Sequence, residues 1–144
     1  MSIPDADIPR RIVKASPKLA PDDDQRFTGE VVVERIGEAG VKLLRVLFRD
    51  GARTAIHRHD TEQWLYFLDG HGFVQHLDAH GNSMDDPILT EACDSVVTPP
   101  GVWHHHGALA GDHTMHLSIT CLVTDYDDNW QLGRFLPPVR PHTR

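Results

Sequence analysis

Histidine is unevenly distributed along this chain. Five of the 11 histidines stand in two short clusters, His57/His59 and His104/His105/His106. Neutral imidazole is the commonest metal ligand in proteins, and it is also the commonest acid or base near neutral pH. The two clusters therefore predict a metal site, a proton-transfer site, or both.

The spacing of the first cluster fits a metal site built on a β-strand. Alternate residues of a strand point to the same face, so the rings of His57 and His59 can enter one interior. Gln63 stands four residues further on, at the head of the next expected strand, and His104 follows a tight turn at residues 99–101. In a closed barrel these four side chains can converge on one point.

The frame around these residues resembles the two motifs that define the cupin family. The matching positions are Gly51-x5-His57-x-His59-x3-Gln63-x6-Gly70 and Pro99-x-Gly101-x-x-His104. The resemblance covers about residues 27–123. It implies an all-β cupin double-stranded β-helix, or jelly-roll barrel, which holds one divalent metal ion through His57, His59, Gln63 and His104.

The sequence departs from the cupin pattern at three positions. Gln63 stands where the family has glutamate, Cys93 stands at the opening glycine of the second motif, and Ala108 stands at its final asparagine. Counting from either end of the first motif leads to Gln63, which we prefer as a ligand over its neighbour Glu62. In that arrangement Glu62 faces away or hydrogen-bonds to a ligand histidine.

The set of three histidines and one glutamine is similar to that of a smaller group of single-domain cupins. This group includes manganese-dependent bacterial hydroxynitrile lyases and relatives labelled carboxymuconolactone-decarboxylase-like cupins, and sugar-acid-processing cupins share the set. The resemblance implies manganese as the first choice of metal, with iron, nickel, cobalt and zinc open. It also implies that His116 lines the pocket, so we expect His116 as the general base, with His106 second.

Three neutral imidazoles and a neutral amide leave the charge of a divalent ion uncompensated. Such an ion is a strong Lewis acid for an alkoxide, enolate, carboxylate or cyanide. We therefore expect a non-redox, lyase-type enzyme that cleaves or rearranges a C–C or C–O bond of a small oxygenated metabolite. The alternatives are an iron-dependent dioxygenase, a cyclase or isomerase of natural-product biosynthesis, and a non-catalytic module that binds a small molecule.

The chain is expected to form one domain with flanking segments. Residues 1–25 contain four prolines and predict an extended N-terminal arm. Residues 26–124 form the barrel, and residues 125–144 form a C-terminal tail with one short helix. Period-two runs and turn signals predict strands at 29–35, 41–48, 52–57, 63–68, 72–77, 94–98, 102–106 and 114–123.

Composition and charge limit the classes of molecule that the protein is expected to bind. The formal net charge is −7 and no basic run occurs, which argues against nucleic acid or an anionic membrane surface. The beginning of the chain lacks the apolar core of a signal peptide, so we expect a cytoplasmic protein in which Cys93 and Cys121 are buried, reduced thiols. The partner is a small-molecule substrate, and the family resemblance implies a homodimer.

Overall fold

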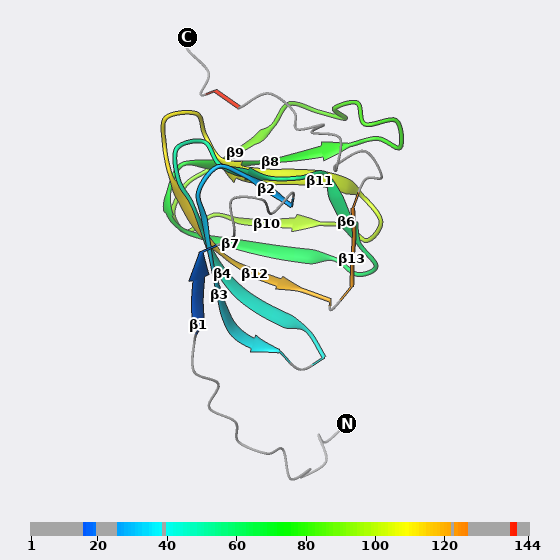
Figure 1. The fold of residues 1–144 in the computed structure, drawn as a ribbon. Helices are drawn as coiled ribbons and strands as arrows, with labels where there is room; N and C mark the ends of the chain where they lie inside the picture. The colour runs from blue at the N-terminus through cyan, green and yellow to red at the C-terminus, as the bar shows by residue number, and fades with distance from the viewer. Residues whose placement is uncertain (1–15, 20–25, 39, 122, 127–138, 141–144) are drawn as a thin grey trace.

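The computed structural model consists of two antiparallel β-sheets packed face to face (Figure 1). It describes residues 16–19, 26–38, 40–121, 123–126 and 139–140. One sheet is curled, and the two together form the jelly-roll barrel that the sequence predicts. The expectation of an all-β jelly-roll barrel is therefore confirmed.

The first sheet has six strands in the order β1-β3-β4-β12-β7-β10. Alternation is clearest in β7, where Gln63, Leu65 and Phe67 are buried and the residues between them are exposed. This period of two places Gln63 on the inner face with the aliphatic and aromatic core. The strands are β1 Ser16–Leu19, β3 Val31–Glu38, β4 Lys42–Phe48, β12 Thr114–Thr120, β7 Gln63–Gly70 and β10 Ser95–Thr98.

The second sheet has seven strands, and β11 is its central strand. On one edge β11 pairs with β5 and β6, and on the other it pairs with β8, which also pairs with β9. The path continues from β6 to β13 and from β5 to β2. The strands are β2 Phe27–Thr28, β5 Arg53–Thr54, β6 His57–His59, β8 Gly72–Leu77, β9 Ile88–Thr90, β11 Trp103–Ala108 and β13 Thr124–Tyr126.

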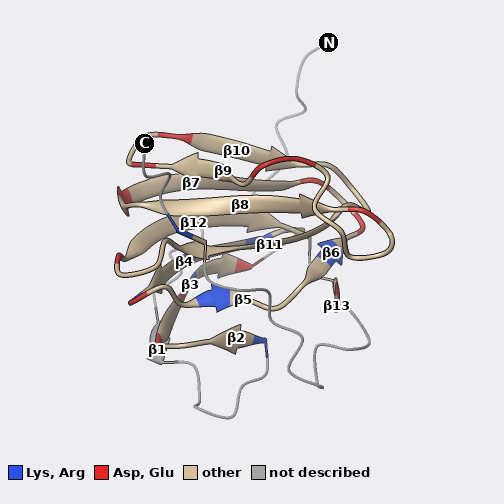
Figure 2. Ribbon diagram, turned by 90° about the horizontal axis from the view of Figure 1, so that it is seen from above, with Lys and Arg blue, Asp and Glu red and all other residues tan. Residues whose placement is uncertain are grey.

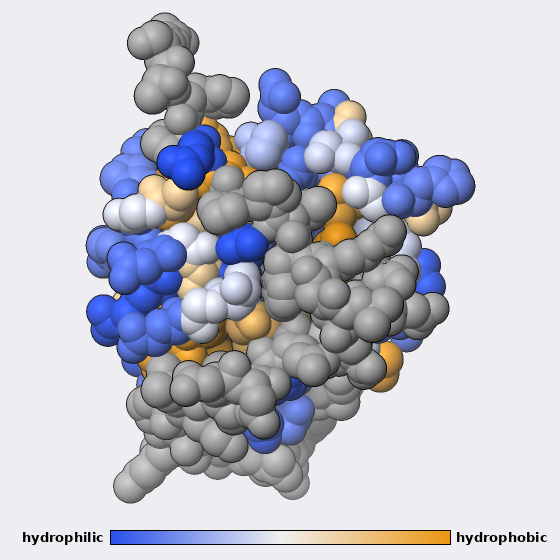
Figure 3. Space-filling view, turned by 45° about the horizontal axis from the view of Figure 1, so that its top comes forward, coloured by the Kyte–Doolittle hydropathy of each residue, from blue (hydrophilic) through white to orange (hydrophobic). Residues whose placement is uncertain are grey.

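Apolar side chains fill much of the space between the sheets. One cluster of buried residues packs around Phe48 and Val46, and a second packs Phe67 and Leu65 against Val74. Acidic residues gather mostly in the turns at the strand ends rather than in the strand bodies (Figure 2). On the face seen in Figure 3, hydrophilic side chains lie toward the periphery, with smaller hydrophobic areas between them. Apolar packing therefore accounts for much of the interior. The buried polar side chains between the sheets are not part of these apolar clusters.

The flanking segments are only partly described. Within the expected N-terminal arm, Ser16–Leu19 forms strand β1 and pairs with β3, while residues 1–15 and 20–25 lie outside the described residues. The expected C-terminal helix also lies outside them, whereas β13 spans residues 124–126. No helix in the described part of the chain could cross a membrane.

The two cysteines correct one expectation. Both thiols are free, but Cys93 is exposed and Cys121 is partly exposed, so neither is a buried core residue. Cys93 is the third residue of the turn Glu91–Asp94 between β9 and β10, and its backbone φ of 76° lies in the left-handed region. Turn geometry rather than core packing thus places Cys93 at the surface.

Candidate metal centre

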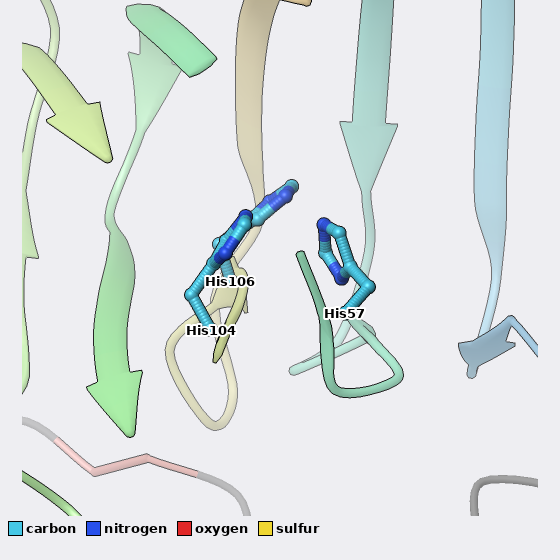
Figure 4. A group of neighbouring side chains, drawn as sticks. All are labelled: His57, His104 and His106. Carbon is cyan, nitrogen blue, oxygen red and sulfur yellow. The ribbon is translucent and has the colours of Figure 1, made fainter. Parts of the chain in front are cut away.

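Three buried histidines from neighbouring strands form the centre of the site. His57 comes from β6, and His104 and His106 come from β11. Each offers a ring nitrogen, and these nitrogens all lie within 4.8 Å of one another. Figure 4 shows the ring of His57 turned toward the rings of His104 and His106, which stack at 15° to each other. The group has the residue type and spacing of a metal site.

Local hydrogen bonds leave one nitrogen of each of two histidines available to a metal. Nδ1 of His57 lies 2.7 Å from the carbonyl oxygen of Ala55, and Nδ1 of His104 lies 2.8 Å from that of Val102. A carbonyl only accepts, so each Nδ1 carries the hydrogen and each Nε2 carries a lone pair. Burial, helped by the neighbouring histidines, lowers the pKa of His57 to about 3 and holds the pKa of His104 well below its usual value. Both rings are therefore neutral at pH 7.

Gln63 lies against His104 on the inner face. Its side-chain nitrogen donates to Ser118 Oγ at 3.3 Å, and its Oε1 lies 3.0 Å from Nε2 of His104. With the His104 hydrogen held on Nδ1, two lone-pair atoms face each other across that 3.0 Å. A cation in contact with both removes the repulsion, and neighbouring ligands about 2.1 Å from a metal lie about 3 Å apart. Gln63 is buried and Glu62 is exposed.

His59 lies beside the three-histidine group rather than within it. Its ring centroid is 5.1 Å from that of His57 and 5.4 Å from that of His104. Nδ1 contacts the hydroxyl of Thr124 at 3.2 Å, whereas Nε2 is buried without a hydrogen-bond partner. A buried nitrogen without a partner is unfavourable unless something else satisfies it. Its chemistry therefore fits a metal ligand, and the residues of this site as a whole fit a divalent cation.

His106 and His116 form a second pair behind this group. Nε2 of His116 lies 3.2 Å from Nδ1 of His106, so one hydrogen is shared between the two rings. The ring of His116 packs against Phe48 and Phe67, with centroids 5.4 and 5.5 Å away. Burial lowers the pKa of His116 to about 3 and that of His106 well below its usual value. Both rings are therefore neutral at pH 7, and each keeps one nitrogen without a hydrogen.

No carboxylate compensates a cation at this site within the described residues. The only buried acidic side chain there is Glu34, and it forms an ion pair with Arg45. The other buried polar side chains in that part of the chain are neutral histidine, glutamine, threonine and serine. A divalent ion held here would keep its full charge available to a ligand.

Strand alternation correctly separates His105 from its neighbours. His105 is buried on the opposite face, where Nε2 contacts Gln75 Oε1 at 2.9 Å and the ring packs on Phe73. His76 lies within β8 beside His104, with ring centroids 6.5 Å apart. Its Nε2 contacts Thr98 Oγ1 at 2.9 Å. Only the pairing of β8 with β11 reveals this position.

Comparison with known proteins identifies a matching family and similar folds. A family model described as Cupin domain matches residues 44–123. The chain is similar to a cupin-like protein from Thermotoga maritima, at 26% identity and a TM-score of 0.64 over 77% of this chain and 89% of that chain. A predicted oxalate decarboxylase from the same organism gives 18% identity and a TM-score of 0.62, over 78% of this chain and 97% of that chain.

A third similar structure belongs to a protein with known metal centres. Oxalate decarboxylase from Bacillus subtilis, described with Mn(II) centres, gives 17% identity and a TM-score of 0.56 over 71% of this chain and 29% of that chain. At these identities the two decarboxylases show a shared fold alone. The chain matches no curated protein sequence.

Proposed function

The chain belongs to the cupin family, and from this membership we propose that it is a metal-dependent enzyme that catalyses a lyase-type reaction on a small oxygenated molecule. We assign His57, His59, Gln63 and His104 as the residues that hold the ion, with manganese as the first choice of metal. The observation that carries the proposal is the neutral donor set beside the His106–His116 pair. A bound divalent ion would supply a Lewis acid for a substrate oxygen.

The histidine pair supplies the proton acceptor in this proposal. His106 faces the donor group, and His116 lies behind it at hydrogen-bond distance. When His106 removes the proton of a substrate hydroxyl, the O–H electron pair forms a carbonyl. The adjacent bond then breaks and its electrons leave with the departing group. For this step the shared hydrogen must be on Nδ1 of His106 and be accepted by Nε2 of His116, which orients the His106 ring and leaves its Nε2 free to accept the proton.

The apolar surroundings of the pair keep both rings in the neutral form that a base needs before reaction. Phe48 and Phe67 flank His116, and the one buried acidic side chain of the described residues, Glu34, is paired with Arg45. A protonated ring would therefore be poorly stabilised there, and the pair returns its proton readily once the substrate bond has broken. This cycle needs no oxidant, which separates it from the dioxygenase alternative.

Replacement of His116 by phenylalanine tests the proposal without leaving a large hole beside Phe48 and Phe67. We expect His116→Phe to keep its metal and to lose about 10² to 10⁴-fold in turnover of a 2-hydroxynitrile or β-hydroxycarbonyl panel. Metal content by mass spectrometry and product formation by chromatography are measured on the same preparation. Unchanged turnover in the variant would show that His116 has no part in the proton transfer assigned to the His106–His116 pair.

Two further outcomes would replace the proposal by its alternatives. Oxygen consumption in proportion to product would identify a dioxygenase. Saturable binding of a panel compound without product from any member would identify a non-catalytic binding protein. An anaerobic reaction at the aerobic rate is the result that the lyase proposal requires.

A further inference from the structure

Strand β13 runs beside the strand that carries two of the assigned ligands. In the antiparallel pairing of β13 with β6, Thr124 lies opposite His59, Asp125 opposite Arg58 and Tyr126 opposite His57. Opposite residues of two strands project to the same face. β13 therefore places one side chain next to each residue of the ligand strand, although it is only three residues long.

On the inner face, β13 provides the hydrogen-bond partner for Nδ1 of His59, which β6 does not provide. His57 and His104 each use the carbonyl two positions earlier in their own segment to fix the hydrogen on Nδ1. His59 instead places Nδ1 3.2 Å from Thr124 Oγ1, and the backbone of Val123 also contacts this ring. Since Nε2 of His59 has no partner, both contacts fall on the Nδ1 side. The orientation of this one ring therefore depends on a different strand.

The tautomer of His59 follows from the same contacts. If Nε2 carried the hydrogen, a buried N–H would have no acceptor, which is strongly unfavourable. With the hydrogen on Nδ1, it is donated toward Thr124, and Nε2 keeps a lone pair in the interior. Nε2 in that form can bind a metal.

The outer face of β13 makes a separate contact. Asp125 accepts a hydrogen bond from Arg58 Nε at 2.9 Å, and the Arg58 guanidinium lies 4.3 Å from the centroid of the Trp103 ring. These groups are partly exposed and point away from His59. A substitution at Asp125 therefore alters the same strand without touching the His59 ring.

We propose that Thr124 is a positioning residue of the metal centre, which holds His59 with its hydrogen on Nδ1 and its Nε2 free to bind the ion. The proposal rests on the proposed metal-binding function for its affinity prediction only. The tautomer prediction concerns the metal-free protein and stands on geometry alone. Side chains that orient a metal ligand in this way commonly change metal affinity about 10- to 100-fold when they are removed.

Three variants separate orientation of His59 from stability of the strand. Thr124→Val keeps the shape and removes the hydroxyl, Thr124→Ser keeps the hydroxyl, and Asp125→Asn alters the outer face. Manganese affinity is measured by competition with a chelating dye. We expect about a tenfold loss for Thr124→Val, the lower end of the range because the Val123 backbone remains. We expect changes of less than about twofold for the other two variants.

The metal-free protein gives an independent measurement. Long-range ¹H–¹⁵N spectra at pH 7 report which nitrogen of His59 carries the hydrogen, and we expect Nδ1–H in the wild type and a larger Nε2–H fraction in Thr124→Val. An Nε2–H ring in the wild type would overturn the proposal, as would equal losses of affinity in Thr124→Val and Asp125→Asn. A wild type without metal affinity would contradict the proposed function. The spectra would still show whether Thr124 holds the hydrogen of His59 on Nδ1.

Discussion

His57 lies directly opposite His104 in the pairing of β6 with β11, and their ring centroids are 4.3 Å apart. Each residue belongs to a different sequence motif, so this one pair joins the two motifs in the folded barrel. The flanking positions follow from alternation, which sends His59 and His106 to the same face. A single strand register thus determines which imidazoles meet.

Removal of the facing pair should abolish metal binding. We expect the double variant His57→Ala/His104→Ala to be purified without metal under conditions in which the wild type retains about one ion per chain. Metal content by mass spectrometry checks this. His105→Ala is the matched control, because that ring is buried on the same strand but faces the other way. A double variant that keeps its full metal content would contradict the assigned centre.

Gln63→Glu should change the charge of the centre without changing its shape. A carboxylate at this position neutralises part of the ion's charge, so we expect tighter manganese binding and a loss of lyase turnover of about tenfold or more. Chelator competition and product formation measure the two effects. Glu62→Gln is the control and should leave both unchanged, because Glu62 is exposed. A larger effect at position 62 than at position 63 would exchange the roles of the two residues.

The metal-free protein should lose stability as the pH falls below about 6.5. Burial lowers the pKa of His57, His105 and His116 to about 3 in the folded state, whereas the unfolded chain takes up protons near the usual value of 6.5. The unfolded state therefore binds more protons between these values, and the free energy of unfolding decreases on acidification. We expect a loss of up to about 2 kcal/mol per histidine between pH 7 and pH 5.

Urea unfolding at pH 7, 6 and 5 measures this loss. The variant His105→Gln removes one of the rings whose pKa is lowered to about 3 and should show a shallower dependence than the wild type. A free energy of unfolding that stays constant over this range would contradict the prediction.

Cys93→Gly should stabilise the protein. Cys93 has a φ of 76°, and its backbone N–H donates to Phe67 O at 2.8 Å, which fixes that conformation. A side chain costs about 1–2 kcal/mol in the left-handed region, while glycine costs about 0.5–1 kcal/mol in unfolded-state entropy. We expect a net gain of about 0.5–1 kcal/mol. Cys93→Ala keeps the strain, so a comparable gain in that control would show that loss of the thiol, rather than relief of strain, is responsible.

The sequence predicts much of the barrel because period-two alternation and turn residues are local signals. The expected run at residues 72–77 coincides with β8, and the run at 63–68 lies within β7. Short strands escape this reasoning. Both β2 and β13 have too few residues for a period to be seen, and only their partners β5 and β6 make them strands. The expected run at 52–57 divides into β5 and β6, which pair with successive parts of β11.

The candidate site shows the same division between local and long-range information. The His-x-His spacing places two rings on one face, and the motif frame selects Gln63 over Glu62. His106 entered the sequence analysis as a second choice of base, and the structure places its ring nitrogen among those of His57 and His104. Thr124 could not be found, because a threonine acquires a role at His59 only when a distant strand pairs with β6. The expected homodimer stays a prediction.

The position of β11 between β6 and β8 has a consequence for kinetics. Gln63 and His104 are 41 positions apart in the chain, and they meet only after strands from both sheets have assembled. The donor set is therefore absent from the unfolded chain and forms late, since long-range strand pairing is the slow part of such folding. An ion that binds only the finished barrel slows unfolding and leaves the folding rate nearly unchanged. The bound ion should thus lengthen the lifetime of each folded molecule rather than hasten its formation.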